Sequence, residues 1–307
     1  MKVTVETLTP APALAKAEAA EKPMGVVLSE LFKLRLTFLV LLTTLVGFYA
    51  GSRGPLAYGL MINSVLATGL VAAGASALNQ LLEREFDARM LRTRGRPLPS
   101  GRLSPQTVLV IGTLCAAAGL AYLALAANWL TAVLGAVTLG SYLFIYTPLK
   151  RVTTLNTAIG AIPGALPPLM GWTAARGEIS AAGWSLFAIL FFWQLPHFLA
   201  IAWMYRDDYA KAGFVMLPIT DPSGERTGHQ ALSHTLGLLP VSLGPFVFKL
   251  VTPAYLAGAW LLGLVFIWCA FQFCRQMTMR WARTLFYASI LYLPLLLIGM
   301  VVAKAKP

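Results

Sequence analysis

The chain has 307 residues, of which 58% are hydrophobic and only 12% are charged. This composition excludes an ordinary soluble domain of the same length, because such a domain carries about twice as many charged side chains. The net charge of +12 could suit nucleic acid, but the basic residues lie between long apolar runs rather than in a polar domain. We therefore expect no nucleic-acid partner. The basic residues instead predict membrane orientation and an anionic ligand.

The N-terminal segment is rich in alanine, proline, glutamate and lysine, and it has no apolar run of the kind found in signal peptides. Its glutamates, together with the absence of arginine before residue 35, argue against a mitochondrial transit peptide. We predict a disordered cytoplasmic tail over residues 1–27. An interfacial segment at 28–35 then opens a single membrane domain that covers residues 28–307.

Nine apolar runs follow, most of them near the roughly 20 residues that a helix needs to cross a bilayer. All should be helices, because runs this long and continuous cannot build a closed barrel. The predicted fold class is therefore an all-α, polytopic membrane protein with nine transmembrane helices. The predicted spans are 36–52, 57–82, 106–126, 128–147, 154–175, 181–205, 230–250, 254–274 and 282–303.

The orientation of these spans follows from the distribution of lysine and arginine. The N-terminal segment and the loops after the even-numbered spans carry 19 of them, whereas the opposite side carries five. The positive-inside rule places the side with more basic residues in the cytoplasm. With nine spans, the C-terminus would then lie on the other side of the membrane.

The loop after the second span and the end of that span hold the densest polar stretch, NQLLEREFDARMLRTRGRPLPSGR. Asn79, Glu83 and Asp87 recur every four residues, so on a helix they stay within about 80° of one another. One carboxamide and two carboxylates on one face offer the oxygen ligands that Mg²⁺ prefers. Arginines follow at once, at positions 89, 92, 94 and 96, and guanidinium groups match phosphate oxygens. The stretch therefore predicts a diphosphate site, and RTRGRPLPSG is a candidate mobile lid over it.

A second acidic cluster follows the sixth span, where Asp207, Asp208 and Lys211 are predicted to face the same compartment. Two halves of a bundle could each supply part of one site in this way, although two ordinary solvated loops would have the same sequence. Lys150 and Arg151, after the fourth span, could add cationic contacts to phosphate. A juxtamembrane basic pair can equally be only a topology signal.

Polar residues also interrupt the apolar runs. His197 lies in the middle of the sixth span, and an ionisable residue at membrane depth is costly enough to indicate function, although a core histidine bonded to a neighbouring helix is the alternative. Asn156 opens the fifth span and needs a hydrogen-bond partner at that depth. The glycines and prolines that follow it predict irregular backbone against a cavity. Aromatic side chains, among them Tyr142, Tyr146 and Trp193, also lie in these runs, where most aromatics simply pack.

The spacing of Asn79, Glu83 and Asp87 resembles the first acidic motif of the UbiA superfamily of intramembrane prenyltransferases. Three longer stretches are similar to its haem-using branch: EREFDARMLRTRGRPLPSGR, YTPLKRVTTLNTAIGAIPGALPPLMGW and WQLPHFLAIAWMYRDDYAKAGFVMLPI. The likeness covers residues 33–302 and implies a UbiA-type bundle of nine helices in the bacterial inner membrane. It also implies transfer of farnesyl from farnesyl diphosphate to a vinyl group of haem B, giving haem O for haem-copper terminal oxidases. A downstream haem-modifying enzyme is a further candidate partner.

The resemblance also assigns roles to single residues. At least one Mg²⁺ ion would be held by Asn79, Glu83 and Asp87, with Asp207 and Asp208 facing them. Diphosphate would be bound by Arg92, Arg96, Lys150, Arg151 and Lys211. His197 falls in the motif of the haem-using branch and would contact or ligate the porphyrin. Glu83 stands where the superfamily usually has aspartate, as is typical of the haem branch. Lys211 stands where a further aspartate is common, which leaves a second metal ion open because an ammonium group repels it.

Two other functions remain as alternatives. One is a UbiA-type enzyme that prenylates a quinone precursor or a chlorophyll-type acceptor, against which the RTRGRPLPSG and WQLPHFLAIAW stretches argue. The other is a transporter of an anionic substrate that uses the same arginines without chemistry. Transporters commonly show inverted repeats and charges near the membrane midplane, whereas the carboxylates here gather at one rim.

Overall fold

The computed structural model describes residues 22–305, in which all regular elements are helices apart from one isolated antiparallel bridge between Val251 and Lys304. The predicted all-α class is thus confirmed. The helices are α2 (Met24–Leu31), α3 (Leu34–Gly51), α4 (Tyr58–Asp87), α5 (Pro105–Ala126), α6 (Trp129–Gly140), the π-helix η1 (Ser141–Tyr146), α7 (Thr147–Leu149), α8 (Asn156–Arg176), α9 (Ala181–Met204), α10 (Arg206–Lys211), α11 (Leu217–Thr220), α12 (Glu225–Ser242), α13 (Gly244–Val247), α14 (Ala254–Gln276) and α15 (Met279–Val302).

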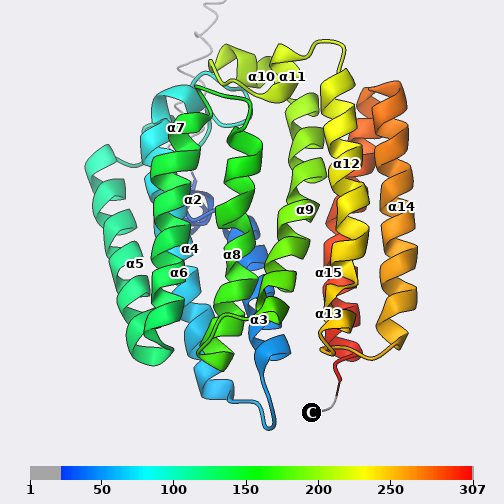
Figure 1. Ribbon diagram of the computed structural model, residues 1–307. Helices are drawn as coiled ribbons and strands as arrows, with labels where there is room; N and C mark the ends of the chain where they lie inside the picture. Colours follow the sequence, from blue (N-terminus) through cyan, green and yellow to red (C-terminus); the bar gives the residue numbers. More distant parts are fainter. Residues whose placement is uncertain (1–21, 306–307) are drawn as a thin grey trace, which may run out of the picture.

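Seven of the predicted spans are long and apolar enough to cross a membrane in the described residues: 34–51, 58–87, 105–126, 129–149, 181–204, 254–276 and 279–302. Large apolar side chains such as Leu125, Phe144 and Val302 are exposed on them, as expected for a surface that faces lipid. The chain is therefore a multi-pass membrane protein. The predicted fifth and seventh spans correspond to α8 and α12. These two helices run alongside the others in Figure 1 but are less apolar.

The seventh predicted span is displaced along the chain. It was expected over residues 230–250, whereas α12 begins at Glu225 and ends at Ser242. Asp221 explains the early start, because its Oδ2 accepts hydrogen bonds of 2.8 Å from both the backbone N–H and the hydroxyl of Thr227. These bonds satisfy groups in the first turn of the helix. Hydrophobicity alone missed this polar turn.

The helices form a bundle in which α3, α8 and α9 lie between α4, α5 and α6 on one side and α12, α14 and α15 on the other (Figure 1). The polar end of α4, the short helix α7 and the α10–α11 segment all lie at the same end of the bundle, opposite the C-terminus (Figure 1). The sequence predicted these segments on one side. The bundle therefore brings the loops after α4, α7 and α9 together.

The N-terminal part of the domain differs in detail from the prediction. Most of the predicted tail, residues 1–21, lies outside the described residues, but residues 24–27 belong to α2. The interfacial segment expected at 28–35 is divided between α2 and α3. The division falls at Lys33, whose backbone is left-handed with φ 47°. This break directs the chain from α2 into the first span.

The contact between α3 and α8 depends on two glycines. A Cβ atom on Gly171 would collide with the backbone oxygen of Thr44 and lie 2.6 Å from the backbone nitrogen of Phe48. A Cβ atom on Gly47 would collide with the backbone of Pro168. Small residues at helix interfaces allow backbones to approach this closely in membranes. Both helices also border the main cavity of the bundle, so this contact fixes the position of one cavity wall relative to another.

We expect Gly171→Ala to lower the free energy of unfolding by about 1–3 kcal/mol, because overpacking against backbone atoms cannot be relieved by a side-chain rotation. Gly258→Ala is the matched control, since that glycine is also helical and has no neighbouring atom within 4 Å of an added Cβ. Thermal unfolding of both variants in detergent measures the difference. Equal melting temperatures for the two variants would contradict the close packing of α3 on α8.

Candidate active site

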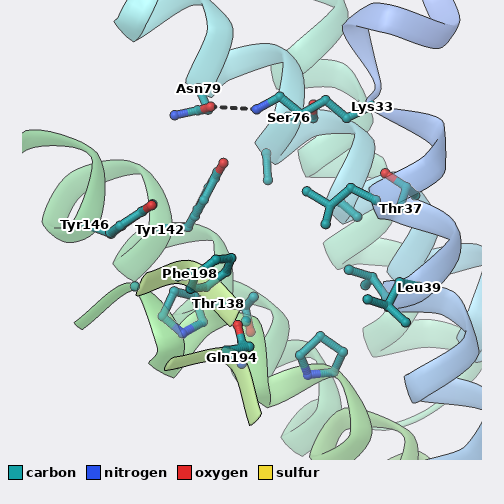
Figure 2. A pocket seen from close by; sticks show the side chains of 18 of the residues that line it. Lys33, Thr37, Leu39, Ser76, Asn79, Thr138, Tyr142, Tyr146, Gln194 and Phe198 are labelled. Carbon is teal, nitrogen blue, oxygen red and sulfur yellow. Dashed lines mark hydrogen bonds between the residues drawn. The ribbon is translucent and has the colours of Figure 1, made fainter. Parts of the chain in front are cut away.

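A cavity of about 340 Å³ lies inside the bundle, bordered by α3, α4, η1, α8, α9 and the loop after α4. Charged and amide side chains line one part of it: Lys33, Asn79, Glu83, Asp87, Arg92, Arg96 and Lys150. The remaining wall is largely apolar or aromatic. Figure 2 shows Lys33 and Asn79 facing each other across one part of the cavity, while Thr138, Gln194 and Phe198 lie farther along it.

The cavity face of α4 carries Asn79, Glu83 and Asp87. All three are helical because α4 continues to Asp87, five residues beyond the predicted end of the second span. The three side chains are almost fully buried, with exposed fractions of 1%, 5% and 1%. Burying two carboxylates is costly unless cations or hydrogen bonds compensate their charge. Their burial therefore requires partners of opposite charge.

Each of these side chains is held by a cation that also lines the cavity. The Lys150 ammonium group donates to both oxygens of Glu83, at 2.8 and 3.1 Å. Arg96 donates to Asp87 Oδ2 at 2.6 Å, and Lys33 donates to Asn79 Oδ1 at 2.9 Å (Figure 2). With Arg92, four cationic side chains face two carboxylates in the cavity wall. This excess of positive charge suits a polyanionic ligand.

Lys33 is a site residue that the sequence analysis missed. Its position depends on α4, where Ser76 Oγ donates to Leu31 O at 2.8 Å and Gln80 Nε2 donates to the same oxygen at 2.7 Å. These bonds anchor the end of α2, and the left-handed backbone at Lys33 then turns its side chain into the cavity. Desolvation there, with repulsion from Arg96, lowers the pKa of Lys33 to about 7. Its only sequence signal is a lysine flanked by apolar residues.

Lys150 keeps its charge more firmly than Lys33. Burial disfavours its ammonium form, but the nearby Tyr146 and Glu83 outweigh burial and raise the pKa of Lys150 above its usual range. The ammonium nitrogen also lies 4.6 Å from the centre of the Tyr146 ring. These contacts favour the charged form of Lys150 at the wall of the cavity.

The donor set fits a hard cation. Asp87 Oδ1 is buried and has no hydrogen-bond partner within the described residues, so one carboxylate oxygen remains available. Amide oxygen from Asn79 and carboxylate oxygen from Glu83 lie on the same helix face. Across residues 22–305, no group of three His, Cys, Asp or Glu side chains is clustered closely enough to hold a metal alone. Only two of the four expected carboxylates, those of Glu83 and Asp87, line the cavity.

Two tyrosines of the π-helix η1 line the cavity next to this polar region. Tyr142 and Tyr146 stack with their ring centres 5.6 Å apart (Figure 2). Thr147 donates to Tyr142 O at 2.8 Å, five residues back, and its hydroxyl also accepts from Asn79 Nδ2 at 3.2 Å. π-Helical turns often mark functional sites. Through Thr147, which directly follows η1, this π-helical turn is hydrogen-bonded to Asn79 on the predicted metal-binding face of α4.

The fifth predicted span lines the cavity without becoming irregular. α8 remains α-helical from Asn156 to Arg176 despite the expected break. Gly160, Pro163, Gly164 and Pro167 form part of the cavity wall. Their side chains are short or absent, which leaves room inside the bundle. Asn156 has the hydrogen bonds that it was expected to need, because Nδ2 donates to Thr153 O at 2.6 Å and to Val215 O at 2.8 Å.

His197 lines the same cavity on α9. Its ring stacks against Trp193 and Phe286, with centroid separations of 5.2 and 5.0 Å. Nδ1 lies 2.7 Å from the hydroxyl oxygen of Ser289 on α15, and Trp193 Nε1 donates to Ser289 O at 2.8 Å. The same cavity thus connects the charged side chains with the intramembrane histidine.

Four of the predicted site residues do not reach the cavity. Asp207, Asp208 and Lys211 lie on α10, and the Asp207 side chain is 89% exposed with only a 3.9 Å contact to Arg206. The expected arrangement, in which Asp207 and Asp208 face the carboxylates of α4, is therefore absent from this structure. The helical phase of α10 accounts for this, because it turns Tyr209 to the cavity while Asp207 is exposed and the half-buried Asp208 does not line the cavity. Arg151 is also outside, with its guanidinium group 4.8 Å from the Phe86 ring.

The loops at this end are joined to each other. Arg92 donates to the hydroxyl of Tyr209 at 3.0 Å, which connects the loop after α4 with α10. Val215 N donates to Lys150 O at 2.7 Å, and Phe214 stacks on Phe86 with a centroid separation of 5.7 Å. Within the candidate lid, Leu98 is also buried, in a cluster with Leu31, Ala77 and Val108. The loops after α4, α7 and α9 are thus held against one another.

Comparison with known proteins gives consistent results. Residues 40–299 match the UbiA prenyltransferase family. A protein from Solibacter usitatus called protoheme IX farnesyltransferase is 45% identical over 278 residues, which cover 87% of this chain and 94% of that relative. A structure of digeranylgeranylglyceryl phosphate synthase has a TM-score of 0.76 at 16% identity, covering 90% of this chain and 97% of the other. A UbiA homolog from Archaeoglobus fulgidus bound to GPP and Mg²⁺ has a TM-score of 0.60 at 15% identity, covering 89% and 99%.

Proposed function

The chain belongs to the UbiA prenyltransferase family, and on this premise we propose that it transfers the farnesyl group of farnesyl diphosphate to a vinyl group of haem B. The products are haem O and diphosphate. Farnesyl C1 bonds to the terminal vinyl carbon, and water adds its hydroxyl group to the other vinyl carbon and releases a proton. The observation that carries this proposal is the single cavity with cations and carboxylates in one part and His197 in another. Family membership also decides against the transporter alternative.

The polar end of the cavity would bind diphosphate. Lys33, Arg92, Arg96 and Lys150 would neutralise the oxygens of the leaving group, which become more negative as the C–O bond breaks. Bound Mg²⁺ would add charge stabilisation at the same oxygens, with Asn79, Glu83 and Asp87 as its ligands. The free oxygen of Asp87 and the bound homolog from Archaeoglobus fulgidus support this assignment. Cations that now pair with the carboxylates would turn to phosphate when metal and substrate enter together.

The aromatic wall would protect the allylic cation. The same cavity is lined by three aromatic side chains, those of Tyr142, Tyr146 and Trp193. Their π faces can stabilise positive charge. The surrounding bundle keeps bulk water from quenching the cation to farnesol. Apolar residues of α3 and α4, including Leu39, Val40 and Val71, would hold the farnesyl chain. His197 would contact the porphyrin.

We propose that Asp207 and Asp208 join the site only in the substrate-bound state. α10 is a short helix of six residues, and Tyr209 is its hydrogen-bonded link to the loop after α4. When Arg92 turns to phosphate, this link would break and α10 could rotate its carboxylates inward. Lys211 would turn with them and add a contact to phosphate, and Arg151 would do so by leaving the Phe86 ring.

The proposed membrane arrangement has nine spans, with α8 and α12 added to the seven helical segments that are long and apolar enough to cross a membrane. The distribution of lysine and arginine supports a cytoplasmic N-terminus and cytoplasmic loops after α4, α7 and α9. The C-terminus would lie across the bacterial inner membrane. Haem O would pass to a downstream haem-modifying enzyme and to haem-copper oxidases.

Purified protein in detergent tests this function directly. We expect haem B, farnesyl diphosphate and Mg²⁺ together to yield haem with the added mass of farnesyl plus water, and EDTA to abolish the product. Mass spectrometry after a timed incubation measures both. A quinone precursor offered with the same donor is the control acceptor. Prenylation of the quinone precursor with haem left unchanged would retain the family and overturn the proposed acceptor.

A further inference from the structure

Ser289 determines where the proton of the His197 ring lies. The Ser289 hydroxyl oxygen is 2.5 Å from the backbone oxygen of Phe286 and 2.7 Å from His197 Nδ1. Two oxygens with lone pairs approach this closely only with a proton between them. A backbone carbonyl has no proton to give, so the single hydroxyl proton of serine lies toward Phe286. Ser289 Oγ is therefore an acceptor for His197, and Nδ1 must carry its own proton.

The second ring nitrogen is then left with a lone pair. A doubly protonated imidazolium would be a buried cation among Trp193, Phe198 and Phe286, and in residues 22–305 no carboxylate forms an ion pair with His197. Such a charge is costly in apolar surroundings. The ring is therefore neutral with its proton on Nδ1. Nε2 makes no hydrogen bond within the described part of the chain.

The free nitrogen belongs to the cavity. Ser289 is fully buried on α15 and takes the Nδ1 edge of the ring, while the ring itself lines the cavity. A second bond fixes the distance between the two helices, because Trp193 Nε1 donates to Ser289 O at 2.8 Å. α9 thus presents His197 at a defined angle. Nε2 is the ring nitrogen that remains for a molecule in the cavity.

We propose that His197 ligates the iron of the haem substrate through Nε2, and that Ser289 is the positioning residue that maintains the required tautomer. This inference rests on the proposed function. Histidine ligands of metals characteristically donate their other N–H to a fixed acceptor, which sets the tautomer and the ring orientation. Ligation would fix the porphyrin relative to the diphosphate end, so that a vinyl group faces C1 of the farnesyl chain. It would also favour haem over iron-free porphyrin.

Haem binding without farnesyl diphosphate tests this separately from catalysis. Ferric haem B is titrated into the full-length protein in detergent, and absorption and electron paramagnetic resonance spectra are recorded. We expect a nitrogen-ligand spectrum for the wild type, its loss in His197→Ala, and its return when imidazole is added. Iron-free protoporphyrin IX should bind more weakly to the wild type and equally to both proteins.

The Ser289 variants test the positioning role. We expect Ser289→Ala to lower haem affinity by about tenfold to a hundredfold and to give a mixed spectrum, because a metal-binding histidine that loses the acceptor of its other N–H is no longer held in one tautomer and orientation. Ser289→Thr retains the hydroxyl and should preserve the wild-type spectrum. Ser242→Ala is the matched control, because Ser242 is also fully buried and hydrogen-bonded, but its hydroxyl partner is Tyr292 rather than His197. Thermal unfolding identifies variants that fail to fold.

Each opposing result has a distinct meaning. A wild-type spectrum in folded His197→Ala would overturn the ligation, while the proposed function stands if that variant still binds haem. An unchanged affinity and spectrum in Ser289→Ala would overturn the role of Ser289. If folded wild-type protein binds no haem at all, both the ligation and the proposed haem substrate are wrong.

Discussion

Glu83→Gln should lower turnover by at least about a hundredfold, the usual size of the loss when one preorganised electrostatic group is removed from an active site. The amide keeps the shape of the side chain and one oxygen, but it removes a charge that a metal ligand needs. It also leaves the buried Lys150 ammonium without its carboxylate partner. Product mass measured in single-turnover reactions checks the rate.

Glu85→Gln is the matched control on the same helix. The Glu85 side chain is 70% exposed and contacts only its neighbour Arg84, at 3.5 Å. We expect wild-type turnover from it. Equal activity in Glu83→Gln and Glu85→Gln, with both proteins folded, would remove Glu83 from the proposed metal site.

Replacing the carboxylates of α10 by amides tests whether these side chains turn inward when substrate binds. Asp207→Asn and Asp208→Asn affect side chains that lie outside the cavity in this structure. A loss of activity comparable to that of Glu83→Gln would support rotation of α10 toward bound diphosphate. Full activity in both variants would limit the metal site to α4.

Arg96→Lys should weaken farnesyl diphosphate binding by about tenfold to a hundredfold, since hydrogen bonds to charged groups contribute about 1.5–3 kcal/mol. Lysine keeps the charge but lacks the planar guanidinium group, which can donate to two phosphate oxygens at once. In this structure the guanidinium group of Arg96 donates to Asp87 Oδ2 at 2.6 Å. Equilibrium binding of a slowly reacting farnesyl thiodiphosphate in the presence of Mg²⁺ measures this affinity.

Arg94→Lys provides the comparison for Arg96→Lys. Arg94 belongs to the same loop but is exposed and does not line the cavity. Its substitution should leave the affinity unchanged. If both variants bind the analogue as tightly as the wild type, Arg96 does not hold diphosphate.

The face of α4 could be predicted from the sequence because it depends only on helical periodicity. Asn79, Glu83 and Asp87 lie one turn apart, and the structure places all three in the cavity. Lys33 could not be found in this way. Its position depends on the break between α2 and α3 and on hydrogen bonds from α4, which join residues more than 40 positions apart.

The partial failures have equally local causes. The sequence placed Asp207 and Asp208 at the correct end of the bundle, but the rotation of a six-residue helix decides which side chains face inward. His197 could be predicted as a functional candidate because an ionisable residue is rare at membrane depth. Ser289, which fixes its tautomer, gave no signal, because a buried serine in a membrane helix is ordinary and its partner is 92 residues away.

The central claim is that one cavity holds diphosphate and haem at the same time. Electron spin relaxation of bound ferric haem tests it, with Mn²⁺ in place of Mg²⁺ and farnesyl thiodiphosphate as the slowly reacting donor. We predict faster haem relaxation with Mn²⁺ than with diamagnetic Mg²⁺, and loss of this effect in Glu83→Gln. Haem relaxation that is identical with the two metals, in protein that binds both ligands, would contradict a shared cavity.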